Sequence, residues 1–416
     1  MACDLETTVG AALRGRPSVP NTWGGHGGPP LQTLLYVGDV PVEATYHGSA
    51  LLHRLLSDYP PEKLTVVETA KESELKRRLP TVKYISHPIA KQRWLNTRFH
   101  PYAVAWFTRT APRMWPQITQ SLNGFDCESV LTVAHGFGWL TAAEIAMRRR
   151  VPLHLMVHDD WPRVADVAPQ FRNWLDARFA KVYRQAQSRL CVSPAMSRSY
   201  EERYGMPASV IYPSRAADSA NFEDPPARLA DRHEQFTIAF AGTINSHGYV
   251  RALAALQKAL EPVDGRLLIF GPLTADAAQQ VGLKHRNTEI RGLLTSTELL
   301  MRLREEASAL FVPMSFAASD RANMEMAFPS KLADYTATGV PLLIYGPEYC
   351  SAVAWARENP GVAEVVESEP DLAGAIASLA NNPDNRVALG KRALDTGREY
   401  FAHARIQQIF HQSLSA

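Results

Sequence analysis

Short apolar runs alternate along the chain with longer stretches whose apolar residues recur at helical spacing. A first series consists of Thr33–Val37, Leu64–Glu68, Val82–Ile85, Ser129–Ala134, Leu153–Val157, Ser188–Val192 and Ser209–Tyr212. A second series consists of Phe236–Ala241, Arg266–Phe270, Thr288–Arg291, Ser308–Val312, Pro341–Tyr345 and Gly361–Val366. Apolar strands that alternate with helices are typical of parallel sheets covered on both faces. The pattern therefore predicts an α/β protein with two doubly wound sheets.

The length of 416 residues suits two domains, because a single core seldom grows so large. The polar, proline-containing stretch Pro213–Glu234 separates the two series and is typical of a linker. We therefore expect an N-terminal domain over 31–212 and a C-terminal domain over 235–400. Residues 1–30 are rich in glycine, proline and polar residues, which predicts a flexible N-terminal arm.

Composition excludes several classes of protein. Hydrophobic residues make up 46% of the chain and the formal net charge is only +2, which argues against nucleic acid as a partner. No run of 18 apolar residues predicts a transmembrane helix, and the N-terminus lacks the apolar segment of a secretory signal. The four cysteines have no metal-binding spacing. These features predict a cytoplasmic protein without a metal site.

The stretch 91–122 interleaves basic and aromatic residues. Arg93, Arg98 and Arg109 lie among Trp94 and Trp106, together with further aromatic residues. The simpler interpretation is a set of helices packed on the first sheet with solvated arginines. The alternative is a surface for an acceptor or for peripheral contact with the inner face of a membrane.

Polar or glycine residues follow four of the predicted strands, and in parallel sheets such strand ends surround the ligand. They are His135-Gly136, His158-Asp159-Asp160, Gly242-Thr243 and Gly271. Small residues at these positions let a backbone approach an anion. A single glycine is also common as a plain turn, but four such ends predict a cleft. Nucleotide, zinc-hydrolase and serine-hydrolase signatures are missing, and Gly136-Phe137-Gly138 is a weak match to the first.

The stretch Phe328–Pro341 is the most specific motif. It predicts a loop, a helix capped by Ser330, a glycine that ends the helix and a buried strand. Lys331 beside a helix N-terminus suits a pyrophosphate, and Asp334 one turn later suits ribose hydroxyls. The alternative is a surface helix with a Lys–Asp pair.

This motif resembles the "P-x-K-L-x-E-Y-x-x-x-G-x-P" donor-site variant of the family-4 retaining glycosyltransferases. The resemblance extends over nearly all of the chain after residue 30 and implies the GT-B fold, in which two Rossmann-like domains face a central cleft. It places Asp334 on the donor ribose and Ser330 and Lys331 beside the diphosphate.

The N-terminal half resembles the same family. His158 matches the histidine expected near the transferred sugar, and His135 follows the other histidine strand. Gly48, within Val40–Leu56, matches the loop that closes over donor and acceptor. The resemblance also implies that a C-terminal helix, within 401–416, packs back on the N-terminal domain.

Two positions depart from the family pattern. Met326 stands where the first glutamate of the donor motif is expected, with Glu325 beside it. Thr243, Asn245 and His247 follow Gly242, where the family has an arginine and a lysine, and Arg251 comes further on. A catalytically inactive relative that binds a nucleotide sugar or a glycan as a scaffold, or a nucleotide-sugar epimerase of the same architecture, are the alternatives.

The expected activity is transfer of a hexose-type sugar from a nucleoside-diphosphate sugar, with UDP favoured, to an acceptor hydroxyl with retention and without a metal or other cofactor. A glycan or a lipid-linked molecule would be the acceptor. We expect Lys331, His158 and Asp159 to be catalytic. The expected donor site adds Gly242, Thr243, Arg251, Gly271, Ser330, Leu332 and Asp334, and the expected acceptor cleft comprises Gly48, His135 and Asp160.

Overall fold

The first half of the chain forms a seven-stranded parallel sheet. The computed structural model describes residues 31–44, 47–70, 77–244 and 246–415. The strand order is β3-β2-β1-β4-β5-β6-β7. The strands are β1 (Leu34–Gly38), β2 (Leu64–Glu68), β3 (Lys83–Ser86), β4 (Ser129–Val133), β5 (Leu153–Val157), β6 (Ser188–Cys191) and β7 (Ser209–Val210). The helices are α1 (His47–Leu56), α2 (Gln92–Leu95), α3 (His100–Thr110), α4 (Trp115–Ser121), α5 (Gly138–Arg149), α6 (Trp161–Val164), α7 (Arg172–Gln185) and α8 (Pro194–Tyr204).

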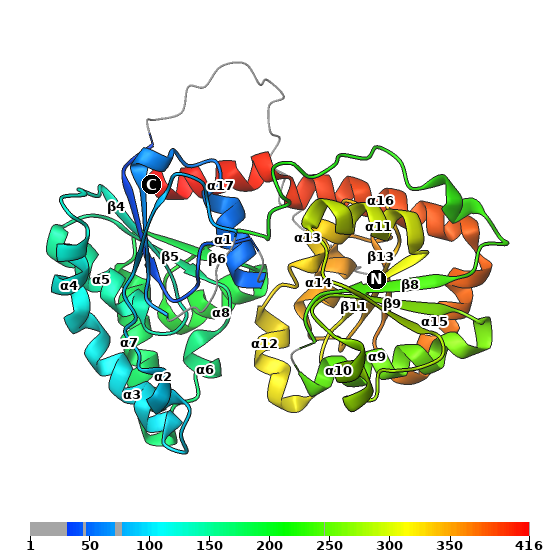
Figure 1. Ribbon diagram of the computed structural model, residues 1–416, viewed down its shortest axis with the longest axis horizontal. Coiled ribbons are helices and arrows are strands. Elements are labelled where there is room, and N and C mark those ends of the chain that lie inside the picture. The colour runs from blue at the N-terminus through cyan, green and yellow to red at the C-terminus, as the bar shows by residue number, and fades with distance from the viewer. Residues whose placement is uncertain (1–30, 45–46, 71–76, 245, 416) are drawn as a thin grey trace, which may run out of the picture. The chain divides into compact units, whose positions relative to one another are not determined.

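The second half forms a six-stranded parallel sheet in the order β10-β9-β8-β11-β12-β13 (Figure 1). The strands are β8 (Thr237–Ala241), β9 (Arg266–Phe270), β10 (Thr288–Gly292), β11 (Ala309–Pro313), β12 (Leu342–Tyr345) and β13 (Ala363–Val366). The helices are α9 (His247–Leu260), α10 (Ala275–Gln280), α11 (Ser296–Glu306), α12 (Arg321–Met326), α13 (Lys331–Tyr335), α14 (Ser351–Glu358), α15 (Glu369–Asn381), α16 (Pro383–Phe401) and α17 (His403–Ser415).

All thirteen predicted strands are present, with ends shifted by at most two residues. The central strands β1, β4, β5, β8 and β11 are buried along their whole length or nearly so. Helices cover both faces of each sheet, so a central strand shows no polar face, and its composition alone identifies it. The two-sheet α/β prediction is confirmed.

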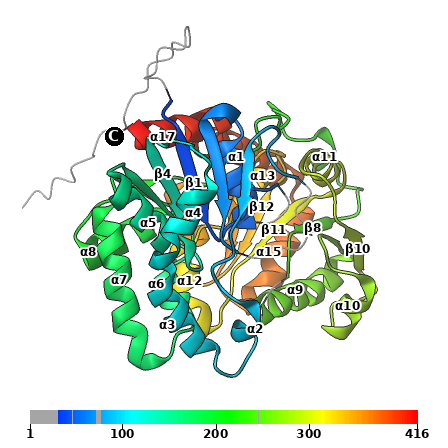
Figure 2. The ribbon, with the colours of Figure 1, turned by 60° about the vertical axis from the view of Figure 1, so that its left-hand side comes forward.

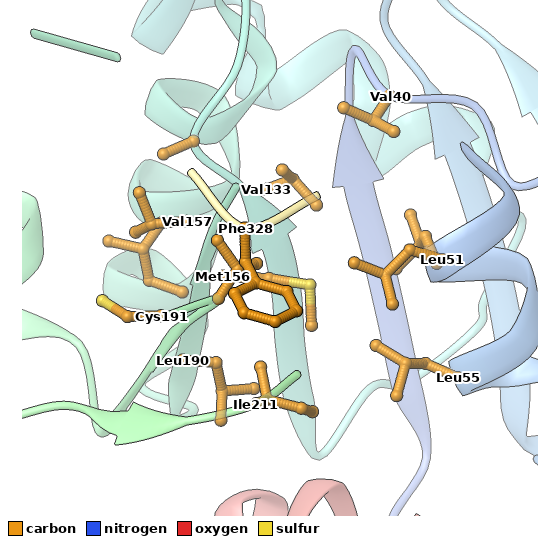
Figure 3. Packing of buried hydrophobic residues seen from close by; sticks show 14 of the residues in the cluster. Val40, Leu51, Leu55, Val133, Met156, Val157, Leu190, Cys191, Ile211 and Phe328 are labelled. Carbon is orange, nitrogen blue, oxygen red and sulfur yellow. The ribbon is translucent and has the colours of Figure 1, made fainter. Parts of the chain in front are cut away.

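Buried contacts join the two halves. One hydrophobic cluster contains residues of both sheets, and Phe328, from the segment before α13, lies in the same cluster as Met156 and Ile211 (Figure 3). A second cluster covers the other face of the six-stranded sheet. From Leu31 onward the contacts group into a single unit. The domain boundaries at residues 212 and 235 therefore stay a prediction.

The last helix returns to the first half of the chain. Helix α17 lies beside α1 in both ribbon views (Figures 1 and 2). The Gln407 side-chain amide of α17 donates to the backbone carbonyl oxygens of Arg54 and Leu55, at 3.0 Å each. His403 contacts the carboxylate of Asp58 at 2.6 Å. These bonds hold α1, and with it the cavity-facing side chains of that helix, in place.

The predicted flexible arm over residues 1–30 lies outside the described residues. Among the described helices, none combines the length and the apolar character that a membrane crossing requires. Cys127, Cys191 and Cys350 are buried free thiols.

Candidate functional site

Two places where the order of strands reverses define the site. The reversal falls between β1 and β4 in the first sheet and between β8 and β11 in the second. At such a point the loops after the two strands diverge to opposite faces and leave a crevice at the carboxyl ends. The loops after β1 and β4 carry Asp39 and His135, and the loop after β8 carries Gly242 and Thr243.

A cavity of about 170 Å³ lies at the second reversal. Six of the predicted donor residues line this cavity. Two arginines from the first half of the chain, one of them in α1, line it as well. The predicted residues are Gly242, Thr243, Gly271, Ser330, Lys331 and Asp334, and the arginines are Arg54 and Arg77. Gly242 and Lys331, 89 positions apart in the sequence, thus line the same cavity.

Gly242 and Gly271 allow two strand-end turns to pack against each other. Gly271 has φ +150°, and a Cβ atom there would clash with the carbonyl oxygen of Gly242. The Gly242 amide donates to the Phe270 carbonyl at 2.9 Å, and the Gly271 amide donates to the Gly292 carbonyl at 2.8 Å. Both amides are therefore engaged. The glycines provide close approach, and the expectation that these amides bind an anion is wrong.

Lys331 provides the positive charge of this cavity. Its ammonium nitrogen lies 5.2 Å from the ring centre of Phe240 and 5.5 Å from that of Tyr249. Burial lowers its pKa to about 8. Among the described residues no carboxylate lies within ion-pair distance of it, and it makes no hydrogen bond. An ammonium held by aromatic faces and lacking an anionic partner is ready to receive an anion.

The helix that follows is shorter than the motif predicts. Helix α13 has only five residues, and the Ser330 side chain makes no capping hydrogen bond. The capping prediction is wrong, because Ser330 itself has helical backbone angles (φ −57°, ψ −23°) that keep its hydroxyl away from the following amides. A helix this short adds little dipole, so the charge of Lys331 dominates. Gly339 has φ +70° at the end of the helical turns, as predicted.

Asp334 has a partner that the sequence did not reveal. Arg54 of α1 binds both of its carboxylate oxygens, at 2.9 and 3.1 Å, and also donates to the Ser214 carbonyl at 2.7 Å. The two side chains are only 15% and 28% exposed. The pair crosses the cavity from the first half of the chain to the second. Arg54 therefore binds the carboxylate that we expected to accept hydrogen bonds from the donor ribose.

A second cavity of about 420 Å³ adjoins the first, and the two share Leu51, Pro213 and Ser330 in their walls. It gathers the other predicted cleft residues. These are Gly48, His135, His158 and Asp159. Ser330 of the donor motif lines the same wall as these strand-end residues of the first sheet.

His158 is a neutral side chain in this second cavity. Burial, together with nearby His135, lowers its pKa to about 4. Its Nε2 atom contacts the Met156 sulfur at 2.9 Å, and its Nδ1 atom would lie 3.4 Å from a Cβ placed on Gly48. A neutral imidazole can donate to or accept from a hydroxyl without bringing a charge. Burial also raises the pKa of Asp159 beside it.

Asp39 is a site residue that the strand-end argument missed. Its carboxylate accepts hydrogen bonds from the amides of Phe137 and Gly138, the latter at 2.6 Å. Gly136 has φ +56°, and a Cβ there would meet the Asp39 carboxylate. The glycine-rich turn after β4 therefore wraps around Asp39. The same signal that selected His135, a polar residue directly after a buried strand, also marks Asp39.

Four further residues do not reach either cavity. Asp160 is fully buried and is held by Tyr200 and Arg203, so it stabilises the first half of the chain and does not face the cleft. Leu332 is buried in the core. Arg251 and Glu325 are exposed and line neither cavity. Asn245 lies outside the described residues.

The site can therefore bind an anion at Lys331 and hydroxyl groups at Asp334, His158 and Asp159. Within the described ranges, no three His, Cys, Asp or Glu side chains are grouped to hold a metal ion.

Comparison with known proteins agrees with this geometry. Residues 63–214 match the family model described as Glycosyltransferase Family 4. No curated protein sequence matches the chain. The solved structure of HepE from Anabaena with UDP and glucose is 12% identical, covers 93% of this chain and 100% of its own, and has a TM-score of 0.62. Sucrose-phosphate synthase from Thermosynechococcus elongatus is 14% identical, with 92% and 98% covered and a TM-score of 0.63. A UDP-forming α,α-trehalose-phosphate synthase from Burkholderia vietnamiensis is 14% identical, with 92% and 98% covered and a TM-score of 0.62. Residues 63–214 are therefore similar to Glycosyltransferase Family 4, and the chain has the GT-B fold of these solved structures.

Proposed function

We propose that this chain is a hexosyltransferase that moves a sugar from a nucleoside-diphosphate sugar to an acceptor hydroxyl with retention, and that it needs no metal ion or other cofactor. The observation that carries the proposal is Lys331. This residue lines the first cavity, no described carboxylate pairs with its ammonium group, and Asp334 lies one helical turn away in the same wall. A diphosphate at Lys331 and a ribose at Asp334 fit the two parts of such a donor.

UDP is the nucleotide that we favour. HepE has been solved with UDP-glucose, and the trehalose-phosphate synthases are described as UDP-forming. The first cavity alone is smaller than the ~300–1,000 Å³ typical of ligand sites. A nucleotide sugar would therefore extend into the second cavity, and its ribose would displace Arg54 from Asp334.

The chemistry follows from the charges. The bond from the anomeric carbon to the diphosphate oxygen breaks, a bond to the acceptor oxygen forms on the same face, and the hydroxyl proton passes to the departing phosphate. Lys331 stabilises the negative charge that develops on the diphosphate. Neutral His158 orients the sugar and the acceptor hydroxyl without adding charge, and Asp159 beside it offers a carboxyl group to the same hydroxyls. Positioning by Lys331 takes the place that a divalent metal has in other transferases.

We propose a glycan or a lipid-linked molecule as the acceptor, bound in the second cavity, and a cytoplasmic location at the inner face of a membrane. The second cavity has polar walls from His135, His158 and Asp159, and Asp39 adds a further carboxylate. These groups suit the hydroxyls of a sugar ring.

The test is calorimetric titration of the full chain with UDP, GDP and ADP, followed by UDP release from UDP-glucose in the presence of candidate acceptors. Binding of one nucleotide with turnover of its sugar conjugate supports the proposal. Absence of binding to all three nucleotides contradicts it.

Binding without turnover would support a different function, a nucleotide-sugar-binding scaffold. The observation that favours this alternative is the place of Arg251, which is exposed and lines neither cavity, so that Lys331 is the expected diphosphate cation that lines the first one. Turnover by an Arg54→Leu variant but not by the natural chain would instead show that the Arg54–Asp334 pair blocks transfer.

A further inference from the structure

Four large aromatic side chains of α2 and α3 and the turn between them face solvent. Trp94, Phe99, Tyr102 and Trp106 are 49%, 56%, 53% and 56% exposed. They line a groove of about 600 Å³ together with Arg93, Thr97 and Ala103. In the described part of the chain only one other aromatic residue, Phe316, is comparably exposed. Exposed aromatic groups gathered on one face mark an interaction surface.

The aromatic surface continues onto the neighbouring helix α7. Tyr102 packs edge-on against Phe171 at 6.3 Å, and Phe171 packs against Trp174 at 6.4 Å between ring centres. A second hollow lies between Tyr102, Trp106 and these rings. The ribbon views place α2 and α3 together on the outside of the first half of the chain (Figures 1 and 2).

The charge of this segment has one sign. None of residues 91–113 is Asp or Glu, whereas five are Lys or Arg. The Arg98 guanidinium lies 4.9 Å from the ring centre of Phe99, and Arg178 of α7 lies 5.3 Å from that of Trp174. Neighbouring elements contribute Asp166, 3.8 Å from His100, and Asp176 of α7, which Arg203 binds at 2.9 Å. The chain as a whole has a net charge of only +2, so the positive charge is concentrated in this segment.

We propose that this aromatic and basic surface, formed by α2, α3 and the start of α7, docks the protein on a lipid bilayer that contains anionic headgroups. Trp, Tyr and Phe side chains partition into the headgroup region, and arginines bind the lipid phosphates. A neutral glycan fits the surface less well, because it offers no anionic groups to the arginines of this segment. A second copy of the chain fits less well too, since a symmetric contact would bring arginines of the same segment together.

The surface lies next to the candidate acceptor cavity. Phe107 of α3 packs on Phe137 at 5.5 Å between ring centres, and Phe137 follows the cavity residue His135 by two positions. A docked protein would therefore hold that cavity near the membrane surface, which suits a lipid-borne acceptor. This consequence rests on the proposed transfer function, whereas docking itself does not.

The test is co-sedimentation of the full chain with vesicles of phosphatidylcholine alone and of phosphatidylcholine with about one third phosphatidylglycerol. We expect binding to the anionic vesicles only. A Trp94→Ala/Phe99→Ala/Trp106→Ala variant should bind at least tenfold more weakly. An Arg93→Gln/Arg98→Gln variant should lose about fivefold per arginine, and the loss should shrink as salt is added.

Matched controls change the same residue types elsewhere. Phe316→Ala removes an exposed aromatic group from the other half of the chain, and Arg286→Gln/Arg405→Gln removes two exposed arginines that have no ion-pair partner among the described residues. These variants should bind vesicles as the natural chain does. All variants should keep their unfolding midpoint and their UDP affinity, so a loss of docking is separable from a failure of the donor site. No binding of the natural chain, or equal binding of the aromatic variant, would overturn the proposal. Concentration-dependent self-association in its place would assign the surface to a second copy.

Discussion

The ammonium group of Lys331 offers the sharpest test of the donor site. We expect Lys331→Met to weaken binding of UDP strongly while leaving the fold intact, because methionine keeps the length and apolar contacts of the side chain but lacks its charge. The aromatic rings of Phe240 and Tyr249 would still pack on the substituted side chain. Nothing in the described structure would lose an ion-pair partner.

The expected magnitude follows from the interaction that is removed. A hydrogen bond between a charged donor and a phosphate contributes about 1.5–3 kcal/mol, which corresponds to a loss of about 10- to 150-fold in affinity. The pKa of Lys331 gives a second prediction. Because burial lowers it to about 8, the ammonium form that binds an anion is lost as the pH rises through 8. Affinity of the natural chain should therefore fall above pH 8, by up to about tenfold per pH unit for one proton.

The assay is calorimetric titration with UDP between pH 7 and pH 10. Lys331→Met should show weak binding whose pH dependence reflects the ligand alone, and Lys258→Met, a change of an exposed lysine in α9, is the control. Stability separates this effect from misfolding. A lysine whose pKa is lower in the folded state destabilises the fold below that pKa, and stability rises as the pH increases from about 8 toward 10.5. Lys331→Met should therefore not lower the unfolding midpoint at pH 7.

Two results would refute the reasoning. One is unchanged UDP affinity in Lys331→Met, which would place the diphosphate elsewhere. The other is the same pH dependence above pH 8 in the variant and in the natural chain, which would show that Lys331 does not titrate against the ligand.

Three further predictions concern neighbouring residues. Arg54→Leu should raise UDP affinity about fivefold by titration, because a partly buried pair of ~1 kcal/mol no longer competes for Asp334, and lower affinity would contradict this. Gly271→Ala should lower the free energy of unfolding in urea by about 1–3 kcal/mol through the clash with Gly242, whereas Gly374→Ala, with open space, should not. Asp160→Ala should cost about 3–5 kcal/mol of stability but leave UDP affinity unchanged in the folded protein, and a selective loss of UDP binding would return Asp160 to the cleft.

Much of the donor site could be predicted from the sequence because its residues lie close together in the chain. The segment from Ser330 to Asp334 is continuous, and Gly242 and Gly271 each end a strand that composition alone identifies. Polar residues directly after buried strands marked His135 and His158 for the same reason, and the second cavity contains both. Asp39 satisfied this rule as well and was overlooked.

The errors have a common cause, which is that side-chain direction is not a property of local sequence. Asp160 directly follows Asp159, yet it turns into the core toward Tyr200 and Arg203 while Asp159 lines the cavity. Ser330 has the residue type of a helix cap but not the backbone angles of one. Arg251, in the first turns of α9, was expected at the diphosphate, and the structure leaves it exposed outside both cavities.

The sequence by itself determined the strands, their parallel arrangement and the donor segment, because these depend on burial and on neighbours a few residues apart. Only the tertiary structure decided that Arg54 binds Asp334 across 280 positions of the chain and that no described residue pairs with Lys331 in this way. It also decided that the aromatic residues of α2 and α3 face solvent. A pairing or an exposure of this kind depends on how two sheets and their helices pack in space, and no local pattern of residues records it.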